Sequence, residues 1–342
     1  MGVNLKDLLI RHEITLEELA GKTLVVDAFN MFFQFLTTIR APDGNYLTDS
    51  KGRVTSHLIG LFNRTTALLQ HGVKLIFVFD GVAPELKQQE RQRRAGIKAN
   101  AQQEYADAEE RGDTEAMKKY AARTTTLTED MLNDAKKLLT LLGIPCLKAP
   151  SEAEAQCAQM VKQGKAWAVA SQDYDTLVYG GLRVVQNLSI AGRRRKIHGK
   201  GTIMVQPVLI DLQENLTNLN ITHEQLIRLA MLIGTDFNYG GIKGIGPKKA
   251  LALVKKHLSS EELFSQTNWN SFSTTPWQQV YETISRIPVD DNMAIPPAEI
   301  NVEALQTFLI DGHDFNPERV STTLQSLLKR PRNQTALGAY FS

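Results

Sequence analysis

Acidic side chains recur in this 342-residue sequence shortly after short apolar runs. Asp27, Asp80, Asp173 and Asp175 each follow a run rich in Val, Ile, Leu, Ala or Phe. Runs of this kind are typical of buried parallel strands, and ligand sites of parallel α/β sheets lie beyond the carboxyl ends of the strands. The spacing therefore predicts that these four acids meet at one edge of a sheet.

Three more acids stand at expected helix ends. Glu152 and Glu154 follow Ser151 at the start of a helix, and Asp236 follows a Gly-Thr pair at the end of another. Two residues apart on an ideal helix, Glu152 and Glu154 point about 200° away from each other. Both reach one site only from the first turn of the helix, which we expect Ser151 to cap.

The seven acids indicate a metal site only when they are taken together. Each alone has an ordinary explanation in a turn or at a helix start. Together on one edge they would repel one another unless cations lay between them, and oxygen ligands select hard ions such as Mg²⁺. Two divalent ions about 4 Å apart are the usual means of phosphodiester hydrolysis. Cys146 and Cys157 lack zinc-ligand spacing, which argues against structural zinc or a disulfide scaffold and fits a reducing interior.

Charge is unevenly distributed although the net charge is only +2. Basic residues gather in 87–98, 193–200 and 243–256, whereas 104–115 is acidic. A single block of this kind is most simply a solvated face, but four blocks beside a surplus of acids favour a polyanionic substrate held near an acidic centre.

The elements that must position these residues alternate along the chain. We expect buried strands at 22–27, 74–79, 166–171 and 182–186, and helices at 53–70, 128–142, 222–232 and 247–257. This alternation predicts an α/β fold with a mostly parallel sheet flanked by helices. Residues 84–128 are polar, so we expect a projecting helical segment, and 267–300 should pack irregularly.

No apolar run reaches the roughly 18 residues of a membrane span, and the N-terminus lacks a secretory apolar stretch. We therefore expect a soluble, intracellular protein without a membrane partner.

An ordered set of motifs resembles the archaeal flap endonucleases of the structure-specific 5′-nuclease family. The motifs are Val26-Asp27-Ala28-Phe29-Asn30, Val78-Phe79-Asp80-Gly81, Ala149-Pro150-Ser151-Glu152-Ala153-Glu154-Ala155-Gln156, Ser171-Gln172-Asp173-Tyr174-Asp175, Gly234-Thr235-Asp236 and the Gly-rich segment 241–250. The resemblance implies a PIN-like fold with a helical arch and a helix-turn-helix DNA clamp. It also implies a 5′ flap endonuclease with 5′–3′ exonuclease activity, acting in Okazaki-fragment maturation and base-excision repair, in the cytoplasm or nucleoid of an archaeal cell.

The resemblance also implies roles for individual residues. Two Mg²⁺ ions, for which Mn²⁺ substitutes, would be bound by Asp27, Asp80, Glu152, Glu154, Asp173, Asp175 and Asp236. Lys87 and Arg94, seven residues apart and so on one helix face, would neutralise the scissile phosphate as charge builds on it. Arg91 shares nearly that face and is an expected DNA contact.

Further DNA contacts are expected at the N-terminus and in the Gly-rich turn. Phe33 stands where many relatives have a Tyr that stacks on a base, and Gly2 is a second expected contact. In the turn, Gly244, Gly246, Lys248 and Lys249 would hold duplex phosphates without reading sequence. The resemblance adds a monovalent cation in that turn.

The last residues resemble a sliding-clamp-binding motif. Gln334 is followed three positions on by Leu337 and then by Tyr340 and Phe341, which one helical turn would bring together as an apolar plug. The sequence thus divides into a nuclease region (1–83), an arch (84–128), an internal nuclease region (129–232), a DNA-binding region with C-terminal packing (233–328) and a clamp-binding tail (329–342), in an expected monomer. A PIN-type ribonuclease and a non-catalytic DNA scaffold remain alternatives.

Overall fold

The structure is a computed structural model that describes residues 2–41, 45–111, 113, 115–116, 120, 126–188, 191–195 and 202–329. The expected clamp-binding residues Gln334, Leu337, Tyr340 and Phe341 lie outside the described residues.

A seven-stranded sheet forms the centre of the molecule, with strand order β1-β9-β6-β5-β2-β3-β4. Its strands are β1 (His12–Glu13), β2 (Thr23–Asp27), β3 (Lys74–Phe79), β4 (Cys146–Lys148), β5 (Ala168–Ala170), β6 (Arg183–Gln186) and β9 (Val208–Asp211). The five strands from β6 to β4 pair in parallel, and β9 pairs antiparallel with β6 and β1. This confirms the mostly parallel sheet that the alternation of strands and helices predicts.

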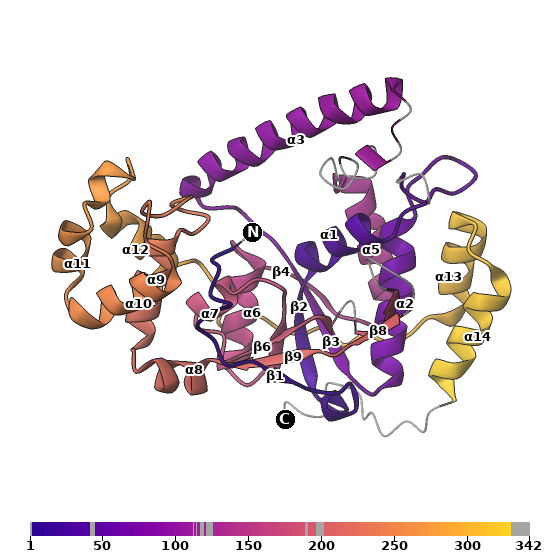
Figure 1. The fold of residues 1–342 in the computed structure, drawn as a ribbon. Helices are drawn as coiled ribbons and strands as arrows, with labels where there is room; N and C mark the ends of the chain where they lie inside the picture. Colours follow the sequence, from indigo (N-terminus) through magenta and orange to yellow (C-terminus); the bar gives the residue numbers. More distant parts are fainter. Residues whose placement is uncertain are drawn as a thin grey trace.

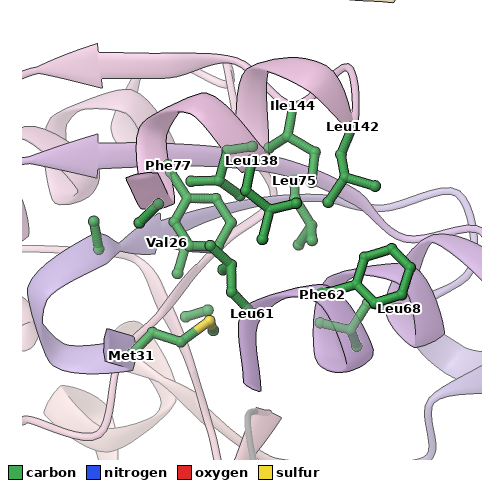
Figure 2. Close-up of a cluster of buried hydrophobic side chains, with 14 of the residues drawn as sticks. Val26, Met31, Leu61, Phe62, Leu68, Leu75, Phe77, Leu138, Leu142 and Ile144 are labelled. Carbon is green, nitrogen blue, oxygen red and sulfur yellow. The ribbon is translucent and has the colours of Figure 1, made fainter. Parts of the chain in front are cut away.

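Alternation along β2 explains how the sheet is covered on both faces. Leu24 and Val26 point into one apolar cluster, whereas Val25 between them points into another. Figure 2 shows the first cluster, where Val26 and Phe77 of the sheet lie against Leu61 of a covering helix and Leu138 of another. Because both faces are buried, the strands read as continuous apolar runs.

Helices cover both faces of the sheet. On the face of the first cluster lie α1 (Ala28–Thr38), α2 (Ser56–Gln70) and α5 (Glu129–Leu141), with α13 (Val302–Gln306) and α14 (Pro317–Leu328) packed outside them. On the opposite face lies α6 (Ala153–Lys162). A third cluster joins the β6–β9 end of the sheet to α7 (Asp175–Val178), α8 (Leu212–Leu219), α9 (His223–Ile233), α10 (Pro247–Lys256), α11 (Ser260–Gln266) and α12 (Trp277–Ser285).

The long helix α3 (Gln88–Glu110) stands apart from these layers. In Figure 1 it crosses the top of the molecule, from the side that carries α9–α12 towards the side that carries α1 and α5. A short 3-10 turn (Glu85–Lys87) connects it to the end of β3. Its polar sequence forms no apolar stripe, so over 88–110 it agrees with the projecting helical segment expected at 84–128. Residues 112, 114, 117–119 and 121–125 of that segment lie outside the described residues.

Three parts of the fold differ from the expectations. A separate hairpin, β7 (Gly192–Arg195) with β8 (Thr202–Val205), includes part of the basic block 193–200 and is not among the strands that the sequence predicts. The antiparallel strands β1 and β9 at the sheet edge are not among them either. Within 267–300, expected to be irregular, residues Trp277–Ser285 form helix α12 around buried Val280 and Ile284. Among the described helices, none is both long and apolar enough to span a bilayer.

Candidate functional site

Three neighbouring parallel strands end at one edge of the sheet, and each carries an acid at or just after its last residue. β5, β2 and β3 lie side by side, so their carboxyl ends meet. Asp27 is the last residue of β2 and also caps α1, because it accepts the Asn30 N–H at 3.2 Å. Asp80 directly follows β3, and Asp173 lies three residues beyond β5. The predicted meeting point of these acids is therefore present.

The start of α6 is held against this edge by Asp80. Glu152 is the N-cap residue, and Asp80 Oδ1 accepts the Ala153 N–H at 2.7 Å. The expectation that Ser151 caps this helix is wrong, because a carboxylate from the neighbouring strand supplies the capping oxygen. Glu154 falls in the first turn, as both glutamates require if they are to face one site.

Gly81 permits the close contact between β3 and the segment before α6. Its N–H donates to the Ser151 carbonyl at 2.7 Å, and a Cβ added there would lie 2.0 Å from the Ala149 carbonyl oxygen. Only glycine fits at this position without displacing the backbone that carries Glu152.

Side-chain hydrogen bonds tie the remaining acids together. The Asn30 amide donates to Asp173 at 2.9 Å, and the Ser171 hydroxyl donates to Glu154 at the same distance. Asp175 accepts the Val3 N–H at 2.9 Å. The N-terminal segment therefore reaches the acid edge from a distant part of the sequence.

Asp236 lies in a turn after α9 that side-chain hydrogen bonds hold in place. The Asn238 amide donates to the Met231 carbonyl at 2.7 Å and accepts the Thr235 hydroxyl at 2.7 Å. Gly234, with φ +116°, ends the helix in a conformation that side chains disfavour. These contacts hold Asp236 towards the other six acids, which we call with it the acid edge: Asp27, Asp80, Glu152, Glu154, Asp173, Asp175 and Asp236.

Charge repulsion in the acid edge is visible in the pKa values. Burial, and after it the charge of Asp80, raise the pKa of Asp27 to about 7. Burial likewise raises the pKa of Asp175 to about 7, against the Val3 hydrogen bond, with Asp236 and Asp173 adding to the increase. The pKa of Glu154 lies well above its usual range because of burial and then Asp175. The acids thus interact as one cluster whose ionised form needs positive charge.

Two basic side chains of the arch base enter the acid edge. Lys87 Nζ forms an ion pair with Glu152 and lies 3.2 Å from Asp236, while Arg94 Nη2 lies 2.8 Å from Asp236 Oδ1. Burial opposes the charge on Lys87, but Glu152 and Asp236 raise its pKa overall. The structure therefore places Lys87, in the 3-10 turn before α3, and Arg94, on α3, against the same acids.

The donor set fits divalent ions in chemistry and charge, because it consists of carboxylates whose ionised forms disfavour one another. Lys87 and Arg94 neutralise Glu152 and Asp236, and no ion pair is recorded within the described residues for Asp27, Glu154, Asp173 or Asp175. In this arrangement the described residues contain no three His, Cys, Asp or Glu side chains grouped so that they could hold a metal ion as they stand.

The expected DNA contacts lie on different surfaces. Phe33, on α1, exposes 42% of its surface, and Arg91 is exposed on α3. Gly2 packs against Asp175, since a Cβ on Gly2 would lie 2.2 Å from Asp175 Oδ2. Gly2 thus adjoins the acid edge itself.

The Gly-rich turn joins α9 to α10. Gly244 has φ +83°, Gly246 is the N-cap of α10, and Pro247 begins that helix. Lys249 Nζ lies 3.5 Å from the Gly244 carbonyl, and Lys248 is exposed beside it. A helix N-terminus next to lysines is suited to an anion.

Sequence reasoning assigned no role to Asn30, Ser171 or Glu90. Asn30 and Ser171 stand inside the motifs of the acid edge, but their contacts depend on how the strands pair. Glu90 accepts hydrogen bonds from Arg93 and Arg94, and this could have been read from the sequence, because residues three and four apart are neighbours on a helix.

Comparison with known proteins gives consistent matches along the chain. The XPG N-terminal domain family matches residues 1–101, and the XPG I-region family matches residues 143–236. The chain is 45% identical to flap endonuclease 1 of Hyperthermus butylicus over 335 residues, which cover 97% of this chain and 95% of that protein.

Solved structures agree. Flap endonuclease-1 from Methanococcus jannaschii superposes with a TM-score of 0.74 at 37% identity, over 95% of this chain and 98% of that one. The catalytic core of Rad2 in complex with DNA substrate has a TM-score of 0.68 at 24% identity, over 93% of this chain and 96% of that one, and shows the same fold.

Proposed function

This chain belongs to the flap endonuclease 1 family, and from that membership we propose that it is a structure-specific nuclease that removes 5′ flaps from branched DNA. It acts in Okazaki-fragment maturation and base-excision repair, with 5′–3′ exonuclease activity as a second mode of the same site.

One observation carries this function beyond the family resemblance. Acids from three strand ends and two helix ends converge on one edge, and Lys87 and Arg94 from the arch base reach into it. A phosphodiester needs both parts, because the acids bind cations and the basic groups neutralise charge on the phosphate as it is attacked.

We further propose that the acid edge holds two Mg²⁺ ions, with Mn²⁺ able to substitute. Asp27, Asp80, Glu152, Glu154, Asp173, Asp175 and Asp236 are the residues that would hold them. Such ions supply an activated water and neutralise charge on the leaving oxygen. Asn30 and Ser171 orient two of the acids by hydrogen bonds, as second partners of metal ligands commonly do.

The rest of the chain positions the substrate. The turn with Gly244, Gly246, Lys248 and Lys249 binds duplex phosphates and, with a monovalent cation, fixes the duplex without reading its sequence. Phe33 stacks on a base at the junction, Arg91 and Gly2 contact the DNA near the edge, and residues 84–128 form the arch that admits the 5′ single strand. The regions 1–83 and 129–232 together form the nuclease core, and 233–328 the duplex-binding part.

The test is cleavage of a labelled double-flap DNA with and without Mg²⁺, mapped to single nucleotides, beside an RNA of matched sequence. The proposal expects Mg²⁺-dependent cleavage at the flap junction, leaving a 5′-phosphate and a 3′-hydroxyl. Preferential cleavage of the RNA would instead indicate a ribonuclease, and DNA binding without cleavage would indicate a scaffold.

We propose a sliding clamp as the protein partner, bound by the tail 329–342. Deleting residues 331–342 is expected to abolish clamp binding in calorimetry and to leave flap cleavage without clamp unchanged, because the acid edge contains no tail residue. The point variant Phe341→Ala, which removes only one apolar side chain of the tail, should lose most of the affinity for the clamp. Clamp binding by the truncated chain at full affinity would place the interface elsewhere.

A further inference from the structure

Glu90 is a buried acid at the base of the arch, outside the acid edge. It lies on α3 with only 2% of its surface exposed, unusual for a glutamate on a projecting helix. Both carboxylate oxygens are used, since Glu90 accepts from Arg93 Nε at 2.6 Å, from Arg93 Nη2 at 2.7 Å and from Arg94 Nε at 2.6 Å.

The contact with Arg94 determines where that guanidinium points. A guanidinium is planar and its N–H groups diverge in fixed directions. With Nε held on Glu90, the terminal Nη2 donates to Asp236 Oδ1 at 2.8 Å. Glu90 therefore links Arg94 to the acid edge without touching the edge itself.

The contact with Arg93 anchors the same carboxylate on the other side. The Arg93 guanidinium lies over the Tyr239 ring, 3.9 Å from its centroid, in the segment that precedes the Gly-rich turn. Burial disfavours an ionised Glu90, yet the hydrogen bonds from Arg93 and Arg94 lower its pKa to about 2, so it stays ionised throughout the neutral range. A charge fixed in this way makes a rigid support.

We propose that Glu90 is a positioning residue for cleavage, which holds the Arg94 guanidinium at the acid edge where the scissile phosphate arrives. The inference rests on the proposed function, because it assigns to Arg94 a contact with that phosphate. Glu90 acts through Arg94 and touches neither the DNA nor the ions.

The change Glu90→Gln separates this role from general electrostatics. Removing one negative charge beside two arginines makes the arch base more positive, so DNA binding should be as tight as before or tighter. The single-turnover cleavage rate should nevertheless fall about tenfold or more, the size of effect seen when an orienting partner is lost. Glu104→Gln, which removes an exposed acid from the same helix, is the matched control and should leave both quantities unchanged.

A double-mutant cycle with Arg94→Ala decides the mechanism. If Glu90 acts through Arg94, the variant with both changes should be no slower than Arg94→Ala alone. Glu90→Asp keeps the charge on a shorter side chain, and its single-turnover cleavage rate should lie between the rates of wild type and Glu90→Gln. It also provides a second variant if Glu90→Gln folds poorly.

Each outcome has a distinct meaning. If Arg94→Ala cleaves slowly but Glu90→Gln cleaves at the normal rate, the positioning role is overturned and the proposed function stands. The same holds if the losses of rate from the two changes add in the double variant. A normal rate for Arg94→Ala removes the proposed role of Arg94 and the inference with it. Weaker DNA binding by Glu90→Gln with an unchanged rate would mean that Glu90 only supports the arch.

Discussion

Replacing Asp175 by Asn is expected to slow flap cleavage by about three orders of magnitude without unfolding the protein. Asn keeps the acceptor for the Val3 N–H but loses the charge that would bind a divalent ion. Loss of a few kcal/mol of metal-supplied stabilisation slows cleavage by about a thousandfold. Single-turnover cleavage of a double-flap DNA at pH 8 with Mg²⁺ measures the effect, and Asp236→Asn should behave alike.

The same change is expected not to lower stability in the metal-free protein. Because burial and repulsion raise the pKa of Asp175 to about 7, its carboxylate at pH 8 is ionised against an unfavourable environment. Melting temperatures in the presence of a chelator check this, with Asp130→Asn on the exposed first turn of α5 as the control for both measurements. Near-normal cleavage by Asp175→Asn and Asp236→Asn would rule out metal binding at these acids.

Removing Lys87 should slow the chemical step more than it weakens DNA binding. Its ammonium lies between Glu152 and Asp236, where a phosphate drawn to bound ions would also lie. Loss of one group that stabilises developing charge costs about a hundredfold to a thousandfold in rate. Lys87→Ala and Arg94→Ala are therefore expected to lower the single-turnover rate by about that much and the affinity by far less.

Lys98→Ala is the matched control, since it removes a cation from α3, the helix that carries Arg94 and directly follows Lys87, and among the described residues Lys98 forms no ion pair with the acid edge. Affinity from a titration with flap DNA in Ca²⁺, set beside the single-turnover rate in Mg²⁺, separates binding from chemistry. A loss confined to affinity would mean that Lys87 merely attracts DNA.

The central strands could be predicted because strands buried on both faces consist of consecutive apolar residues, and such runs are visible in the sequence. Leu24, Val25 and Val26 are apolar in succession because helices bury both faces of the sheet, and Asp27 is the last residue of that strand. The antiparallel strand β9 carries the same apolar signal, and its direction depends on a connection that the residue pattern does not encode.

The sequence predicts that the acids of the acid edge lie close together, but it does not predict which residue contacts which. The ion pair of Lys87 with Glu152 joins residues 65 positions apart, and the cap on α6 comes from Asp80, directly after β3. Such contacts depend on how the strands pair in space. By contrast, the contact of Glu90 with Arg94 lies within one helix and could have been read from the spacing alone.

The pKa values of the acid edge make the proposed metal binding depend on pH. Asp27 and Asp175 have folded pKa values of about 7 against an ordinary value of 3.8. A carboxyl whose pKa is raised on folding contributes stability below about pH 4 and loses it as the pH rises through about 7. A divalent ion must displace their protons at low pH but meets free carboxylates at high pH.

The most direct measurement is therefore the increase in melting temperature that Mg²⁺ or Mn²⁺ causes at pH 5.5 and at pH 8. Subtracting the melting temperature without the ion from that with it, at each pH, removes the contribution of titrating groups elsewhere. One such group is His57, whose burial lowers its pKa to about 4. We expect a clear increase at pH 8, corresponding to about 2.7 kcal/mol at an ion concentration 100 times the dissociation constant, and a much smaller one at pH 5.5. In Asp175→Asn the increase at pH 8 should largely disappear. No stabilisation at either pH, or an equal one in wild type and variant, would contradict the claim that these carboxylates together hold divalent ions.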